Sequence, residues 1–154
     1  MKKLLLIITI SILTFSVNAD SRFGDMTEMR DERMRGKDGK WVRPHPGPFI
    51  WNGIEREQGV FSWEEADKYV VYAQEHNQKT LATIWPHANW EQKSCKRKKA
   101  RSPFGGKFTK YLSKPCSMDN YKIFLMKLVD RYDGDGKNDM PGLTKPIKYW
   151  DIMN

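Results

Sequence analysis

The sequence predicts an α/β fold built around a parallel β-sheet, and two features of the chain support this prediction. From residue 40 onward, segments typical of strands and helices alternate in the order strand, helix, strand, helix, strand. The middle strand is mostly apolar without clean alternation, as in strands that are buried on both faces of a parallel sheet. Alternation of this kind indicates βα units joined by right-handed crossovers.

The first predicted strand is short and is flanked by irregular segments. It comprises Trp41-Val42-Arg43 and ends at Pro44. Residues 20–39 before it are polar and ambiguous, with a short charged helix over residues 26–35 as one interpretation. Residues 45–59 after it are loop-like, with a short extended piece at residues 49–51.

A helix is predicted over residues 63–76, and the middle strand follows it at residues 80–85. Ser62 and Glu65 have the spacing of a capping box, in which each side chain accepts from the other residue's backbone N–H. Apolar residues then recur at helical spacing, at Trp63, Ala66, Val70 and Ala73. Pro86 ends the strand.

A second helix and a third strand follow a long insertion at residues 87–116. Loops of this length within compact domains are usually functional lids or disordered. Ser117 is predicted to cap the helix and Gly134 to end it. The helix has the cleanest amphipathic pattern in the chain, with apolar positions at Tyr121, Phe124, Leu125, Leu128, Val129 and Tyr132. The third strand is predicted at residues 147–153.

The N-terminus has the pattern of a secretory signal. Lys2 and Lys3 precede an apolar stretch at residues 4–17, and small residues follow up to Ala19, where cleavage is expected. The stretch is shorter than the ~20 residues that span a bilayer, and no later segment is apolar enough to do so. We therefore expect a secreted or periplasmic protein without a membrane partner. Its predicted parts are a signal (residues 1–19), a polar segment (20–39) and one domain (40–154).

Positive charge is concentrated in the insertion. The chain has 27 basic and 19 acidic side chains, a formal net charge of +8. Most of the excess comes from one run, formed by Lys93, Lys96, Arg97, Lys98, Lys99 and Arg101. We interpret the run as a solvated loop, with binding of an acidic polysaccharide as the alternative. Because the charge is local and the chain carries an export signal, we expect no nucleic-acid partner.

Two further groups of residues bear on covalent and metal chemistry. Cys95 and Cys116 are the two cysteines, and in an exported chain such a pair indicates one disulfide, worth about 3 kcal/mol. Asp133, Asp135 and Asp139 lie in a Gly-rich segment that departs from the EF-hand pattern. A solvated turn is the preferred interpretation, with calcium as the alternative, and no cofactor is expected.

Aromatic and polar residues gather where the predicted strands end. The carboxyl ends of parallel strands are where ligands bind in such sheets. The residues there are Arg43, His45, Trp51, Trp85, His87, Asn89, Trp90 and Asn154. Tryptophan presents a flat apolar ring that suits the C–H face of a sugar, while amides and cations suit its hydroxyls. The group predicts a carbohydrate site, although any single tryptophan is equally suited to packing.

Four segments together resemble a known family. They are residues 41–45, residues 51–67 with their Trp51, Glu55, Gly59, Phe61, Trp63 and Asp67, residues 83–86, and residues 149–154. Their order and spacing resemble the retaining (β/α)8 glycoside hydrolases, a clan that includes β-galactosidases, β-xylosidases and cellulases. The resemblance covers about residues 40–154.

This resemblance implies part of a TIM barrel, roughly its first four βα units and incomplete at both ends. A complete barrel takes roughly 250 residues. Asn154 matches the family's asparagine that binds the sugar 2-hydroxyl, and the acid/base glutamate is expected directly after it. Arg43 matches the arginine that helps to keep the nucleophile ionised. Both catalytic carboxylates are therefore expected beyond residue 154, and the chain is expected to be inactive alone.

Further expectations concern two carboxylates, the alternative function and the edge of the sheet. Asp151 is expected to make a structural hydrogen bond, and neither it nor Glu55 is assigned to catalysis. The alternative function is that of a secreted, non-catalytic module that binds a carbohydrate or a polyanion. An open parallel sheet has an unpaired edge, so self-association through residues 147–153 is also expected.

Overall fold

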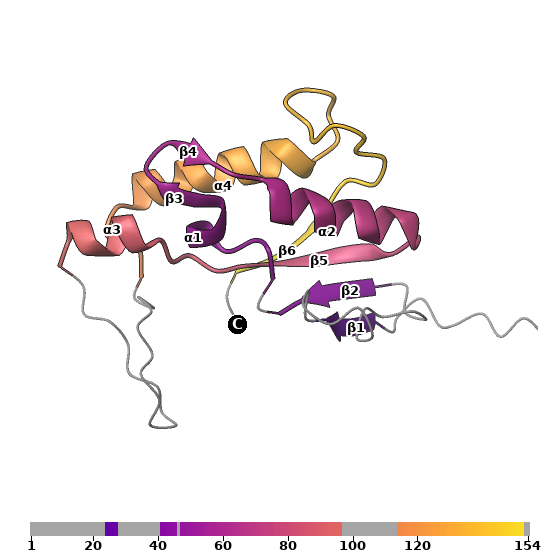
Figure 1. Cartoon of the computed structure of the whole chain (residues 1–154), viewed down its shortest axis with the longest axis horizontal. Helices are drawn as coiled ribbons and strands as arrows, with labels where there is room; N and C mark the ends of the chain where they lie inside the picture. The colour runs from indigo at the N-terminus through magenta and orange to yellow at the C-terminus, as the bar shows by residue number, and fades with distance from the viewer. Residues whose placement is uncertain (1–23, 28–40, 46, 97–113, 153–154) are drawn as a thin grey trace, which may run out of the picture.

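The computed structural model of the chain describes residues 24–27, 41–45, 47–96 and 114–152 (Figure 1). Four parallel strands form one sheet in the order β1-β2-β5-β6. They are β1 (Gly24–Thr27), β2 (Trp41–Pro44), β5 (Lys79–Ile84) and β6 (Tyr149–Ile152). The α/β class and the parallel sheet are thus confirmed, whereas closure into a barrel stays a prediction.

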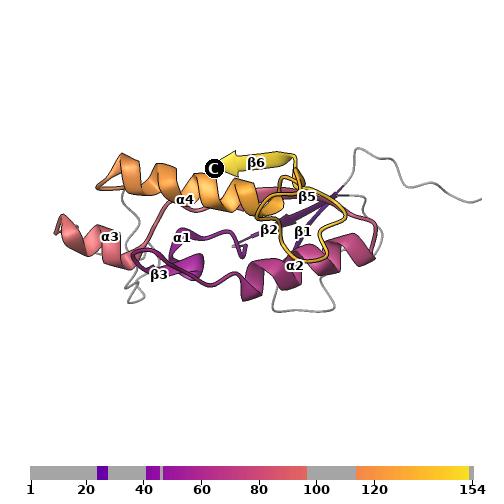
Figure 2. The same cartoon turned by 90° about the horizontal axis from the view of Figure 1, so that it is seen from above.

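Two helices cover one face of this sheet, and two more lie beside its carboxyl end (Figures 1 and 2). The covering helices are α2 (Glu64–Glu75) and α4 (Met118–Tyr132). The short helices are α1 (Trp51–Ile54) and α3 (Asn89–Ser94), and a small hairpin joins β3 (Glu55–Glu57) to β4 (Val60–Phe61). Among the described residues, no helix is both long enough and apolar enough to cross a membrane.

Strand β5 lies between β2 and β6 and organises the core. Its Cα partners are Trp41 and Val42 on β2, and Tyr149 to Ile152 on β6. Successive side chains on a strand point to opposite faces. Val42, Ala82 and Ile84 are buried in one cluster with residues of α2 and α4. Arg43, Thr83 and Asp151 therefore belong to the opposite face.

Helix α4 follows the sequence prediction closely. The Ser117 hydroxyl accepts a hydrogen bond from the Asn120 backbone N–H at 3.2 Å, which confirms the predicted N-cap. Tyr121, Phe124, Leu128 and Tyr132 are the buried residues of the helix. Gly134 follows with a φ of +76°, a conformation that ends a helix and that favours glycine.

The predicted capping box at the start of α2 is wrong. The helix begins at Glu64, Trp63 is the N-cap residue, and no side chain caps the helix. The first turn instead carries Glu64, Glu65 and Asp67. Negative side chains in this position interact favourably with the positive end of the helix dipole, so the helix start is stabilised without a capping hydroxyl.

Strand β1 was not expected from the sequence. It pairs in parallel with β2, and Met26 is the Cα partner of Arg43. The helix considered for residues 26–35 is therefore wrong at Met26 and Thr27, and its remainder lies outside the described residues. The proposed signal at residues 1–19 and most of the basic run also lie outside them, as does Asn154.

Side chains tie the two covering helices together. Asp67 on α2 accepts two hydrogen bonds from the Arg131 guanidinium on α4, at 2.9 and 2.5 Å. The same carboxylate accepts a hydrogen bond of 2.8 Å from the Tyr132 hydroxyl. Tyr132 is fully buried, so this network lies at the edge of the core.

The base of the insertion is closed by one disulfide and two hydrogen bonds. Cys95 and Cys116 form the predicted disulfide, with their Cα atoms 6.0 Å apart. The buried Glu91 carboxylate accepts from the Ser117 backbone N–H at 2.6 Å. The Gln92 side-chain amide donates to the Lys114 carbonyl at 3.0 Å. The two ends of the insertion are therefore joined by hydrogen bonds as well as covalently.

Candidate functional site

The carboxyl ends of β2 and β5 bring three predicted site residues together. His45 follows β2, while Trp85 and His87 follow β5. The His45 and Trp85 rings are tilted, with centroids 5.7 Å apart. His87 meets Trp85 edge-on at 6.3 Å. The structure thus places the Trp85 indole in contact with both imidazoles, at the sheet edge where ligands bind in parallel α/β folds. These three residues, His45, Trp85 and His87, form the aromatic row.

Backbone contacts hold this aromatic row in place. Ile50 forms an isolated parallel bridge with Trp85, and the Trp51 N–H donates to the Trp85 carbonyl at 3.0 Å. The Asn52 N–H donates to the His87 carbonyl at 2.9 Å. The segment after β2 therefore runs beside the segment after β5 and extends the sheet irregularly beyond its regular strands.

Two ring nitrogens in this row are buried. His45 Nδ1 and Trp85 Nε1 have no hydrogen-bond partner among the residues that the structure describes. A buried polar atom without a partner costs about 1–3 kcal/mol. Their placement at the strand ends leaves hydrogen-bonding capacity next to the exposed part of the half-buried Trp85.

Arg43 joins three strands on the face that the helices leave uncovered. Its Nε donates to Thr83 Oγ1 at 3.1 Å, and its Nη2 donates to Asp151 Oδ2 at 2.5 Å. The Arg43 and Asp151 side chains are 24% and 27% exposed. Asp151 thus makes the structural hydrogen bond expected of it. Thr83 was missed, although alternation along β5 places it on the same face as its Cα partner Asp151.

Trp51 and Trp90 have packing contacts instead of an open position. Trp51 is 0% exposed and stacks on Phe124, with ring centroids 5.5 Å apart. Trp90 meets Trp51 edge-on at 5.7 Å and donates to the Glu55 carbonyl at 3.0 Å. A fully buried ring has no surface for stacking on a sugar, so we do not include Trp51 in the candidate site. Nor do we include Trp90, which packs against the core.

Glu55 is a buried carboxylate that serves the fold. Its Oε2 accepts from Trp51 Nε1 at 2.5 Å, and its Oε1 accepts from the Gly59 N–H at 2.7 Å. Each oxygen has a partner, and together they connect α1 to the turn of the β3–β4 hairpin. This explains why a glutamate follows the apolar Ile54 without taking part in a cleft.

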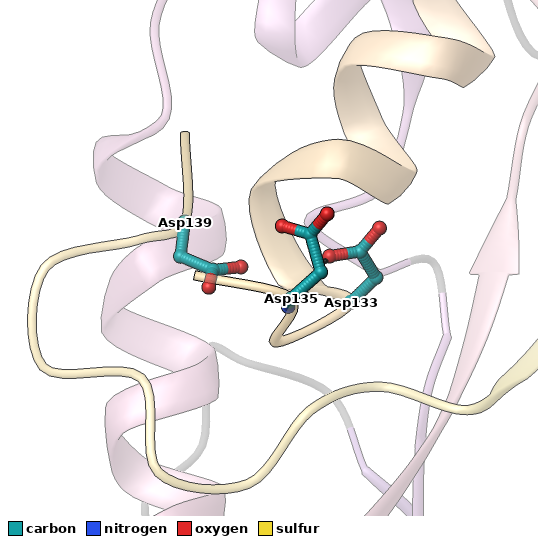
Figure 3. Close-up of side chains that lie close together, drawn as sticks. All are labelled: Asp133, Asp135 and Asp139. Carbon is teal, nitrogen blue, oxygen red and sulfur yellow. Dashed lines mark hydrogen bonds between the residues drawn. The ribbon is translucent and has the colours of Figure 1, made fainter. Parts of the chain in front are cut away.

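The three aspartates of the calcium alternative lie in the connection from α4 to β6 (Figure 3). One oxygen of each lies within 4.8 Å of the others. However, Asp139 accepts from the Gly134 and Gly136 N–H groups at 3.0 and 2.8 Å. Asp135 accepts from the Lys137 N–H at 2.7 Å. These bonds account for an aspartate-rich turn, the preferred interpretation, and calcium binding stays the untested alternative.

Comparison with known proteins identifies the fold. No family model and no curated protein sequence matches the chain. Among solved structures, the chain is similar to a β-galactosidase from the Antarctic haloarchaeon Halorubrum lacusprofundi, with a TM-score of 0.55 and 16% identity. It is equally similar to a β-galactosidase from the psychrophilic Marinomonas ef1, with a TM-score of 0.55 and 15% identity. Each match covers 85% of this chain and 21% of the other. The fold that this chain shares with the two β-galactosidases therefore corresponds to about a fifth of the length of each of them.

Proposed function

We propose that the chain is part of a secreted glycoside hydrolase that cleaves O-glycosidic bonds of a carbohydrate with retention. The observation that carries the proposal is the aromatic row of His45, Trp85 and His87 at the carboxyl ends of β2 and β5. A half-buried indole offers a stacking surface, and the adjacent ring nitrogens can bond hydroxyl groups. The fold shared with part of two β-galactosidases supports the same proposal.

In this proposal Arg43 acts through charge. Its guanidinium already holds Asp151 at 2.5 Å on the uncovered sheet face. A fixed positive charge favours the ionised form of a nearby carboxyl group. This is the role that the resemblance assigns to the arginine at this position, and the carboxylate it would serve is the nucleophile.

The chain alone is proposed to be inactive. Retaining hydrolysis takes two carboxyl groups roughly 5–5.5 Å apart, one as nucleophile and one as acid/base. Six carboxylates of the described residues are half-buried or buried, and each accepts a hydrogen bond from a protein group: Glu55, Asp67, Glu91, Asp130, Asp139 and Asp151. The proposal therefore places both catalytic glutamates beyond residue 154, and it requires a glutamate codon directly after Asn154.

Export is part of the proposal. A disulfide between Cys95 and Cys116 forms and persists in oxidising compartments. This supports the interpretation of residues 1–19 as a secretory signal, and N-terminal sequencing of the exported protein tests it. A new N-terminus at Asp20 is expected, and an uncleaved chain contradicts export by this route.

The binding role is tested with the full chain and two matched variants. Saturation-transfer NMR with methyl glycosides of galactose, glucose and xylose should detect at least one ligand. Trp85→Ala should abolish binding, because the stacking surface is lost. Trp63→Ala removes a half-buried indole next to Arg131, away from the strand ends, and should leave binding unchanged.

A second variant keeps the test decisive if Trp85→Ala does not fold. His45→Phe retains a ring beside Trp85 but removes both ring nitrogens, and it should weaken binding about tenfold. Hydrolysis of 4-nitrophenyl glycosides is expected to be absent for every form. Turnover by the chain alone, or no glycoside bound by any form, contradicts the proposed function.

A further inference from the structure

A cavity of about 450 Å³ lies at the amino ends of β5 and β6, at the opposite end of the sheet from the candidate site. We propose that this cavity binds a small organic anion, a molecule with one oxyanion group on an apolar body. The proposal does not depend on the proposed function, because it uses different residues at a different edge of the sheet.

The wall of this cavity is fixed by the side chain of Gln74 on α2. Its Oε1 accepts from the Thr144 and Lys145 N–H groups at 2.7 and 3.0 Å. Its Nε2 donates to the Gly142 carbonyl at 3.3 Å. These bonds hold the α4–β6 connection against the end of α2, where the two are seen close together in both views (Figures 1 and 2). The cavity thus has a hydrogen-bonded frame.

Three lysines line the cavity: Lys79, Lys145 and Lys148. No carboxylate of the described residues forms an ion pair with any of them. The Lys145 ammonium donates to Asn77 Oδ1, and that of Lys79 lies 5.2 Å from the Trp41 ring centroid. Both partners are neutral, so the positive charge of this edge is not compensated within the described structure.

The inner lining is apolar with neutral polar groups. Val70, Ala73 and Ile147 are buried there, each with 4% exposure or less. Gln78 and Thr80, which are 3% and 8% exposed, add an amide and a hydroxyl. Charges attract one another more strongly beside such a lining than in water, because the local dielectric constant is lower.

This combination selects the ligand class. A volume of 450 Å³ lies within the range of small-molecule sites, about 300–1,000 Å³. The ammonium groups of Lys145 and Lys148 suit the oxyanion, and the surface formed by Val70, Ala73 and Ile147 suits the body of the ligand. A neutral sugar would leave the three charges without a counterion, so an anion is the better match.

The probe is phenyl phosphate. Inorganic phosphate, which has only the charged group, and phenol, which has only the ring, are the two control ligands. Thermal melting of the full chain at constant ionic strength should show a saturable rise in Tm with phenyl phosphate. Inorganic phosphate should give a smaller rise, and phenol none. The backbone amide resonances of Thr80 and Thr144 should shift with the same apparent Kd.

Variants connect the response to the cavity. Lys145→Gln and Lys148→Gln should each raise the Kd about tenfold, because each removes a charge-assisted contact. Lys122→Gln makes the same change on an exposed position of α4 outside the cavity, and it should leave the Kd unchanged. An unchanged Kd in both cavity variants overturns the proposal, as does the absence of any response to phenyl phosphate. Equal responses to phenyl and inorganic phosphate overturn the apolar part of the assignment.

Discussion

Replacing Asp67 with alanine should destabilise the fold by about 3 kcal/mol. The Tyr132 hydroxyl, buried at the edge of the core, loses the acceptor 2.8 Å away, which costs about 1–3 kcal/mol. Arg131 loses both of its hydrogen bonds to the carboxylate. The Arg131 and Asp67 side chains are 18% and 25% exposed, so this pair lies between the surface and buried limits and adds about 1–2 kcal/mol.

A double-mutant cycle measures the coupling energy between Asp67 and Tyr132. Tyr132→Phe alone should cost about 1 kcal/mol, since it removes one hydrogen bond and leaves the Asp67–Arg131 pair intact. The double variant Asp67→Ala/Tyr132→Phe should be about 1 kcal/mol more stable than the sum of the single effects predicts, because no buried hydroxyl is left without a partner.

The assay is urea unfolding followed by tryptophan fluorescence at pH 7, with the m-value checked for constancy. Glu64→Ala is the matched control on α2, because among the described residues Glu64 pairs with the exposed Lys68, and it should lose only its first-turn interaction with the helix dipole, a far smaller effect than that of Asp67→Ala. A coupling energy of zero between Asp67 and Tyr132 would refute the reasoning, since the two side chains would then contribute independently.

Three further predictions follow from other contacts. Burial is the largest cause that raises the pKa of Tyr132 above the usual value of 10, and the hydrogen bond to Asp67 is the next largest. The unfolded chain therefore loses this proton first. The contribution of Tyr132 to the free energy of unfolding should be fully present below pH 10 and should fall above it by up to about 1.4 kcal/mol per pH unit. Urea titrations should show a shallower fall for Tyr132→Phe. Changing Cys95 and Cys116 to serine should cost about 3 kcal/mol in urea unfolding, while near-UV circular dichroism stays native-like because Glu91 and Ser117 remain bonded. The wild-type chain should self-associate through β6, and Ile152→Lys, at a position 58% exposed, should lower the mass seen by light scattering.

Sequence patterns predicted an element correctly where the residues of that element alone specify its structure. The spacing of Tyr121, Phe124, Leu128 and Tyr132 specified the buried face of α4, and Ser117 specified its start. Strand β1 had no such signal, because a four-residue segment that contains glycine and aspartate is stabilised as a strand by pairing with β2. The predicted capping box is wrong although Ser62 and Glu65 have the required spacing. The N-cap residue is Trp63, one residue after Ser62, so the Ser62 side chain does not cap the helix.

The candidate site was predictable as a set of residue types but not as an arrangement. Arg43 and Asp151 are 108 residues apart, and their contact depends on the register that pairs Thr83 with Asp151. Composition likewise could not separate Trp85, at the strand ends, from Trp51, in the core. Both are tryptophans near predicted strand ends, and only the packing of α4 over Trp51 distinguishes them.

The two ends of the sheet differ in chemistry, and this difference separates the two proposals. At the carboxyl ends, the rings of His45 and Trp85 carry hydrogen-bonding nitrogens beside a ring face, which suits a polyhydroxylated ligand. At the amino ends, Lys145 and Lys148 carry charge beside an apolar wall, which suits an anion. Salt therefore discriminates between them. The Debye length is about 8 Å at 0.15 M and shortens as salt is added, so raising the ionic strength weakens the attraction between the lysines and an approaching anion. Phenyl phosphate binding should therefore weaken, while glycoside binding at the aromatic row should be insensitive to salt.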